Sequence, residues 1–412
     1  MAVRAPHLYS SLRCFCLGAF KTLAGELESG ADLPFAFEEH ASPGAPALYE
    51  YRPLVRGFVE TRADRLKALS DTRLALEDLR REPTAAIYAR AHAGAGPTED
   101  EALFRTVLLP LAEMTADRCG GFDWHDDAFD RAYADLERSL FGTRRSYVAV
   151  APLVGLSLGS QLELGDGIRV RVAVTGELST LWPESQGLLP DRFGREPDRL
   201  CMLELARELD AGEPEPPDAP GELADAVTAL RLVTAGAVAA GPVIFERLDW
   251  RPLGIRPVLP IAATPPLGEP TRLDPFRAKL VGEIRGRLPA ADLDPELAEA
   301  LDRWELSLFQ SDAFRSEQLK ESLTSLLGGS DGAWAAALRA ATLLAESPKE
   351  RADLFASIRA YGSDAAVDTV RRALVETLMH GARAALVESV DDAILGLSPR
   401  PAGYLTARAV AS

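Results

Sequence analysis

The residues of this 412-residue chain that could do acid–base chemistry together lie near its C-terminal end. His380 follows Arg371 and Arg372 within one predicted helix. An imidazole can transfer a proton near neutral pH, and a guanidinium can stabilise a phosphate. However, Arg372 lies eight residues before His380, or about 12 Å along a helix axis, which is too far for the two side chains to share one phosphate unaided. The competing interpretation is structural: His380 lies beside a helix interface, and the arginines pair with Asp368 and Glu376.

Two other groups could bind a metal. The segment 123–127 gathers three carboxylates and His125, but five contiguous residues cannot all converge on one ion, and the acids suit the start of a helix expected from Ala128. Cys14 and Cys16 lack a second cysteine pair or a histidine at zinc spacing, so we interpret both as buried thiols of a first helix. We therefore predict no metal site and no cofactor.

The composition excludes several classes of protein. A net charge of −17 opposes sequence-independent binding to nucleic acid, although it does not exclude a local basic groove. The four cysteines are scattered and do not form a disulfide framework. No segment approaches the roughly 20 apolar residues of a membrane span. We expect a cytoplasmic protein without membrane contact.

The elements that must position these residues divide the chain into three regions. Residues 1–142 are predicted to form a helical N-terminal region. Residues 143–270 show the period of two that is typical of strands, and we predict a small antiparallel β-rich domain. Its clearest element is a hairpin over 162–172 that turns at Gly165-Asp166-Gly167, because the two arms alternate and the turn residues tolerate positive φ. The fold class is therefore α+β.

The rest of the chain is predicted to be mainly helical. An acidic, proline-rich segment at 211–221 is expected to interrupt the β-rich domain as a surface loop, with helix from Ala224. Residues 271–412 are predicted to form a C-terminal helical bundle, in which Asp294-Pro295 opens one helix and a last long helix runs on from Ala365.

The C-terminal third resembles the Apea-like branch of the HEPN domains, which are helical bundles linked to RNA cleavage or RNA binding. The resemblance lies in the pattern and apolar spacing of Arg315–Leu327, Leu338–Leu344 and Glu350–Tyr361. Upstream, Pro152–Gly155 and Leu164–Ile168 resemble a strand and a hairpin that often precede such bundles. The resemblance implies a homodimer that pairs through the C-terminal bundle.

The active motif of that family is an arginine, a polar residue, three further positions and a histidine. With His380 as the histidine, Val375 occupies the arginine position and Glu376 the polar one. An apolar side chain cannot stabilise the charge that develops on a phosphate during cleavage. The resemblance therefore implies a non-catalytic binding or scaffold protein that is RNA-linked or defence-linked. The alternative is a metal-independent endoribonuclease that binds RNA at a local site, with Arg371 or Arg372 replacing the missing arginine and His380 transferring the proton.

Overall fold

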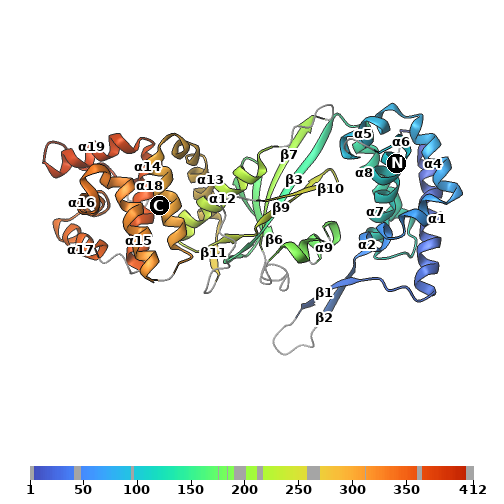
Figure 1. Ribbon diagram of the computed structural model, residues 1–412, viewed down its shortest axis with the longest axis horizontal. Helices are drawn as coiled ribbons and strands as arrows, with labels where there is room; N and C mark the ends of the chain where they lie inside the picture. The colour runs from blue at the N-terminus through green and yellow to red at the C-terminus, as the bar shows by residue number, and fades with distance from the viewer. Residues whose placement is uncertain are drawn as a thin grey trace.

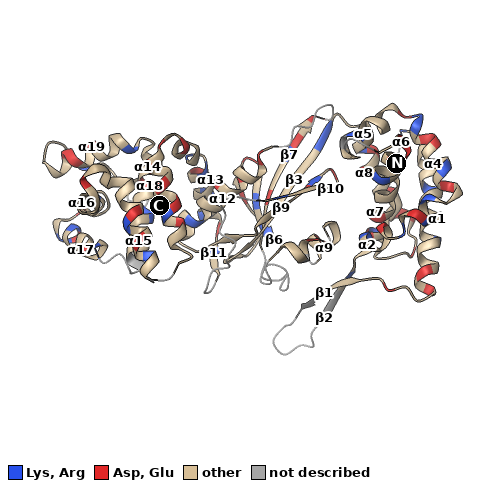
Figure 2. Ribbon diagram, in the orientation of Figure 1, with Lys and Arg blue, Asp and Glu red and all other residues tan. Residues whose placement is uncertain are grey.

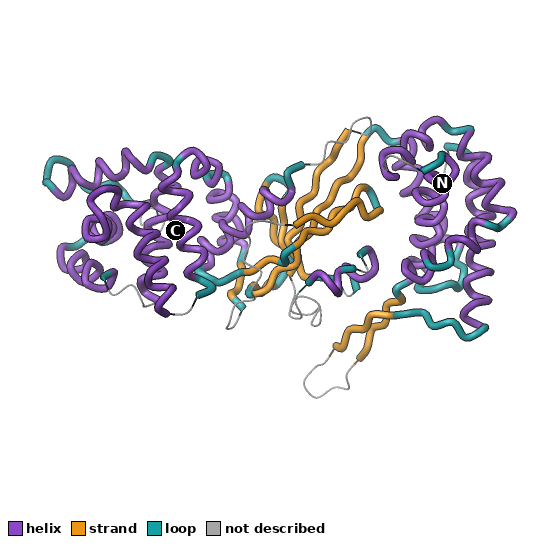
Figure 3. Tube along the Cα trace, in the orientation of Figure 1, coloured by secondary structure: helices purple, strands orange, loops and turns teal. Residues whose placement is uncertain are grey.

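The structure is a computed structural model. It describes residues 4–40, 48–93, 97–174, 176–182, 184–189, 201–210, 217–257, 270–310, 312–359 and 364–404. A layer of β-sheet lies between an N-terminal group of helices and a C-terminal helical bundle (Figures 1 and 3). The predicted α+β class, with antiparallel strands and a helical C-terminal region, is confirmed.

The N-terminal helices pack around α1 (Pro6–Glu28), whose apolar residues recur every three or four positions and are buried along one side. Cys16 lies on that buried side. Cys14 is exposed, so its predicted burial is wrong, because two residues turn a helix through about 200°. The remaining helices of this part are α2 (Val55–Glu60), α3 (Ala63–Lys67), α4 (Ser70–Arg80), α5 (Pro83–Ala93), α6 (Glu99–Leu103), the π-helix η1 (Phe104–Leu108), α7 (Leu109–Cys119) and α8 (Asp126–Phe141).

This region also contains an antiparallel hairpin that the helical prediction for 1–142 did not include. Strands β1 (Phe35–His40) and β2 (Leu48–Pro53) pair only with each other within the described part of the chain. The two strands project from the helices in Figure 1. The segment between them, residues 41–47, lies outside the described residues.

The central sheet has seven antiparallel strands, with β10, β9, β3, β7, β6 and β5 in spatial order and β8 paired to β3. Its strands are β3 (Arg144–Val154), β5 (Leu162–Gly165), β6 (Ile168–Val172), β7 (Cys201–Asp210), β8 (Ala239–Ala240), β9 (Val243–Leu248) and β10 (Arg251–Pro257). The predicted hairpin is β5–β6 and is confirmed. Gly165, Asp166 and Gly167 all have positive φ, at 91°, 46° and 65°. A separate parallel pair joins β4 (Leu156–Leu158) to β11 (Thr271–Leu273).

Helices cover both faces of this sheet. Tyr147 and Ala149 on β3 point to α12 (Ala219–Thr234) and α13 (Pro275–Arg285), whereas Val148 points to the face covered by α9 (Glu177–Leu181) and α10 (Ser185–Leu188). The helix expected from Ala224 begins five residues earlier, inside the predicted loop. Pro220 fits in its first turn, where the backbone N–H that proline lacks would have no helical partner. Asp218 Oδ1 accepts a hydrogen bond from Gly221 N at 3.3 Å. Residues 211–216 of that loop lie outside the described residues.

The C-terminal bundle contains the 3-10 helix η3 (Leu288–Leu293), α14 (Pro295–Ser307), α15 (Asp312–Leu323), the π-helix η4 (Thr324–Gly328), the 3-10 helix η5 (Gly329–Asp331), α16 (Gly332–Leu344), α17 (Pro348–Ile358), α18 (Asp364–His380) and α19 (Arg383–Ile394). Asp294 caps α14 as predicted, accepting from Glu296 N and Leu297 N. The single long helix predicted from Ala365 is wrong, because Gly381 adopts a φ of +81° and ends α18.

The predicted boundary at 142 falls between α8 and β3, and the one at 270 falls just before β11. One hydrophobic core runs across the second boundary, from the sheet through α12 and α13 into the C-terminal bundle, while the N-terminal helices have a core of their own. Acidic and basic residues are interspersed along the described helices and strands of all parts (Figure 2). No described helix combines the length and apolarity that a membrane crossing requires.

Candidate functional site

The histidine and the two arginines singled out from the sequence share α18 but point to different neighbours. Arg371 donates to Asp368 Oδ1 at 2.6 Å and to the carbonyl of Leu232 in α12 at 2.8 Å. Arg372 donates to the carbonyl of Leu344, the last residue of α16, at 3.3 Å. Arg371 therefore holds α18 to α12, and Arg372 holds it to α16. Arg371 also forms the ion pair with Asp368 that helical spacing predicts.

His380 ends α18 and is exposed. Its Nδ1 lies 3.1 Å from the carbonyl oxygen of Ala382, which closes the turn around Gly381. Val375, at the position of the missing arginine, is 1% exposed and belongs to the hydrophobic core. The structure thus brings neither Arg371 nor Arg372 to His380.

A hollow of about 430 Å³ lies beside His380. Among the described residues that line it, Glu376 is the only carboxylate and none is a lysine or an arginine. Glu376 is held in place because Oε2 accepts a hydrogen bond from Tyr404 N at 2.6 Å, and the Tyr404 hydroxyl in turn donates to Glu283. The remaining lining residues are Leu343, Met379, Leu386, Pro401, Ala402 and Gly403. This hollow is acidic and apolar rather than basic.

The acidic segment 123–127 lies at a helix start, as predicted, but α8 begins at Asp126, two residues before the expected Ala128. Asp126 is the first residue of α8 and accepts hydrogen bonds from Arg13 Nη2 at 2.6 Å and from Trp124 Nε1 at 2.9 Å. Both contacts lower the pKa of Asp126, the Arg13 bond most. The Asp126 carboxylate therefore pins the start of α8 to α1, and the absence of a metal at this segment remains a prediction.

A second pocket, of about 310 Å³, lies between the N-terminal helices and the sheet. Its walls come from α2, α7, α9 and the turn that joins β9 to β10. Charged side chains from all four line it: Arg56, Glu113, Glu177 and Arg251. Burial raises the pKa of Glu113 to about 7, although the charge of Arg56 opposes that rise. A partly protonated carboxyl and a guanidinium in one pocket are typical of a binding or catalytic site.

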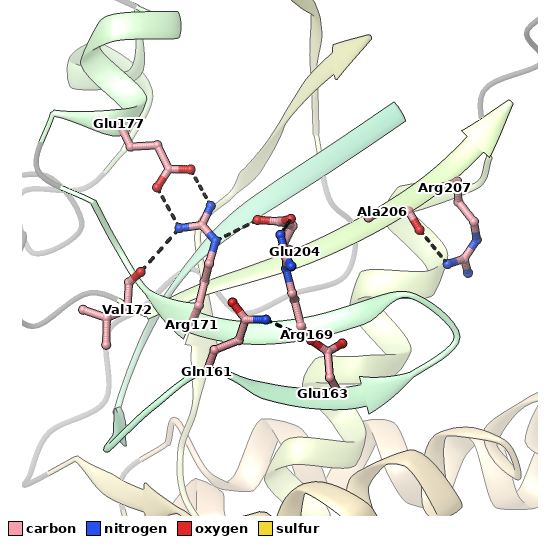
Figure 4. Close-up of polar contacts among 9 residues, drawn as sticks. All are labelled: Gln161, Glu163, Arg169, Arg171, Val172, Glu177, Glu204, Ala206 and Arg207. Atoms are coloured by element: carbon pink, nitrogen blue, oxygen red, sulfur yellow. Dashed lines mark hydrogen bonds and ion pairs between the residues drawn. The ribbon is translucent and has the colours of Figure 1, made fainter. Parts of the chain in front are cut away.

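One wall of this pocket is held by a buried charge network on the sheet (Figure 4). Arg171 on β6 lies between two carboxylates: it donates to Glu177 Oε2 at 2.8 Å and, through Nε, to Glu204 Oε2 at 2.7 Å. Arg169 also donates to Glu204. The network fixes α9, and with it the pocket wall, against the face of the sheet.

Sequence reasoning missed this pocket entirely. Glu113 and Arg251 are 138 positions apart, and each follows the pattern of its own element. The one local signal is Asp249-Trp250-Arg251, where a tryptophan and an arginine sit at a hairpin turn. Such residues are enriched at binding surfaces, but nothing in their spacing says what they face.

Comparisons with protein-family models, with curated proteins and with solved structures returned no match.

Proposed function

We propose that this protein is a non-catalytic binding or scaffold protein, RNA-linked or defence-linked, whose C-terminal bundle resembles the Apea-like HEPN domains. The observation that supports this function best is the character of the hollow beside His380. A carboxylate, Glu376, lines it, and no described lysine or arginine does.

The chemistry of phosphate cleavage explains why this observation matters. Charge builds up on the phosphate in the transition state, and a cation or an array of donors must stabilise it. Arg371 is bound to Asp368 and to a main-chain carbonyl of α12, and Arg372 is bound to a main-chain carbonyl of α16. To act beside His380, each would have to give up these bonds, and Glu376 would still repel the phosphate. The ribonuclease alternative is therefore the weaker proposal.

Exposed aromatic side chains favour a protein partner for the bundle. Trp334 on α16 is 60% exposed, and its ring packs edge-on against Phe355 of α17 at 5.8 Å. Phe314 on α15 is exposed as well. Tryptophan is among the residues most often responsible for binding energy at interfaces. These side chains suit the homodimer contact that the family resemblance implies.

The test of the proposal is a cleavage assay on the full chain. Fluorescently labelled single-stranded RNA is incubated with the protein in EDTA, with the His380→Ala and Arg372→Ala variants alongside. We expect all three proteins to leave the RNA equally intact. Metal-independent cleavage that both substitutions abolish, with circular dichroism unchanged, would show that the bundle is a ribonuclease.

The dimer is tested separately by light scattering coupled to size exclusion. We expect Trp334→Ser to shift the wild-type dimer to a monomer, while Leu253→Ser, an exposed leucine on β10, leaves it unchanged. A wild-type chain that stays monomeric at high micromolar concentration would exclude this partner.

A further inference from the structure

The pocket between α7 and the β9–β10 turn contains a guanidinium whose charge is not neutralised. Nε and Nη1 of Arg251 are buried and have no hydrogen-bond partner in the described part of the chain. Burial lowers the pKa of Arg251, but an arginine starts from a pKa above about 12 and stays charged at neutral pH. A buried, unpaired charge is unfavourable, so its presence in a pocket indicates that an anion binds there.

Glu113 lines the same pocket but does not supply that anion. Burial raises its pKa to about 7, so near neutral pH the carboxyl is not fully ionised. Glu113 and Arg251 attract each other, but within the described residues Glu113 accepts no hydrogen bond from Nε or Nη1 of Arg251. The cationic charge of Arg251 therefore remains available to a ligand.

A second free guanidinium lies beside the first. Arg247 on β9 lines the pocket and has no hydrogen-bond or ion-pair partner within the described ranges. It pairs across the hairpin with Pro252, the residue after Arg251, so both arginines flank one turn. Arg56, which also lines the pocket, is already bound by Glu60 at 2.8 Å and by the carbonyl of Leu181.

Neutral donors and an apolar wall complete the pocket. Trp250 Nε1 and Thr180 Oγ1 are buried without a partner in the described structure, and both residues line the pocket. Val55, Pro110 and Met114 form an apolar wall from α2 and α7. Unsatisfied donors and an apolar wall in one pocket are the combination by which proteins hold a ligand with one charged end and one apolar end.

We propose that this pocket binds a small organic carboxylate. Arg251 binds the carboxylate group through its planar pair of N–H donors, and Arg247 adds a second positive charge. Trp250 and Thr180 donate to the remaining oxygen lone pairs, and the apolar body lies against Met114. A volume of about 310 Å³ suits an acid of about the size of a single ring.

A monoanion fits this pocket better than a phosphate does. Glu113 and Asp117 line the same pocket, and their negative charge would repel a dianion more strongly than a carboxylate. Asp117 is held in place by Arg52, at 3.1 Å between Oδ2 and Nη2, and so does not move away.

The experiment is calorimetric titration of the full chain with benzoate, phenylacetate and hexanoate. Benzamide, which has the shape of benzoate without its charge, and phenyl phosphate are titrated in parallel. We expect at least one carboxylate to bind with a stoichiometry of one and at least tenfold more tightly than benzamide. Equal affinity for benzoate and benzamide, tighter binding of phenyl phosphate, or no saturable binding by any of the three acids would overturn the proposal.

Two variants and one control locate the site. Arg251→Met should weaken carboxylate binding at least tenfold and raise the melting temperature of the unliganded protein, because it removes an unpaired charge. Arg251→Lys keeps the charge but loses the planar pair of donors, and should weaken binding at least fivefold. Arg81→Met, at an exposed site just after the end of α4 and outside the pocket, should bind as the wild type does. Unchanged affinity in both Arg251 variants would show that the ligand binds elsewhere.

Discussion

The buried carboxylate of Glu204 provides a sharp test of what holds the central sheet together. Glu204 is 1% exposed on β7, between Arg169 and Arg171 of the neighbouring strand β6 (Figure 4). Replacing it by alanine leaves two guanidiniums without their shared anion. Arg171 keeps its second carboxylate, Glu177, and the side chain of Arg169 is 34% exposed and can reach water.

These details determine the expected loss of stability. Removing one partner of a buried ion pair costs about 3–5 kcal/mol. Because one guanidinium keeps a partner and the other reaches solvent, we expect Glu204→Ala to fall at the lower end, at about 3 kcal/mol. Glu204→Gln keeps an acceptor and loses only the charge, and should cost about 1–2 kcal/mol.

Hydrogen exchange of the β6 and β7 amides is the suitable assay, because the protein has separate cores that need not unfold together. The control is Glu163→Ala on β5, whose side chain is exposed and whose substitution should change the opening free energy by no more than about 0.5 kcal/mol. If Glu204→Ala changes exchange no more than Glu163→Ala does, the network does not stabilise the sheet and the reasoning fails.

The same network predicts a pH dependence. Burial alone would raise the pKa of Glu204, but the hydrogen bonds and charges of Arg171 and Arg169 outweigh it and lower the pKa. A carboxyl whose folded pKa is depressed stabilises the fold above its unfolded pKa, about 4.3, and loses that contribution as the pH falls through the folded value. Protection of β6 and β7 should therefore fall more steeply below about pH 4 in the wild type than in Glu204→Gln.

Two further predictions concern single residues. Gly381→Ala should lower the free energy of unfolding by about 1 kcal/mol, because the φ of Gly381 is +81°. Gly25→Ala, inside α1, should raise it by about 0.5–1 kcal/mol. Equal effects of the two substitutions in thermal unfolding would contradict the backbone argument. Burial lowers the pKa of His92 to about 4 from an unfolded value near 6.5, so stability should fall by up to about 3 kcal/mol between pH 6.5 and 4. His92→Gln should lack that decline in urea unfolding, and parallel pH profiles would refute it.

The sequence alone determined those parts of the fold whose causes are local. The β5–β6 hairpin follows from alternating side chains and from three residues that accept positive φ, and α14 begins where Asp294 can cap it. The acids of segment 123–127 also lie at a helix start, as their residue types predicted. Each of these features depends on a few consecutive residues, so the local sequence is enough to predict it.

Where the local sequence allowed more than one structure, tertiary contacts determined where helices and strands begin and end. The apolar run from Ala365 allowed one long helix, but Gly381 ends α18 and α19 packs back onto α16. The early start of α12 depends on a proline that is tolerated only in a first turn. The β1–β2 hairpin pairs residues 35–40 with residues 48–53, which are not adjacent in the sequence.

The candidate sites belong wholly to the tertiary structure. Arg371 and Arg372 bind carbonyls of α12 and α16 and not a group beside His380. The positions of these carbonyls depend on how the helices pack, which the periodicity of the sequence does not predict. Arg251 and Glu113 share a pocket because the β9–β10 turn lies against α7. A pocket is made by elements distant in the chain, and burial, not residue type, determines whether its charges are paired or free to bind a ligand.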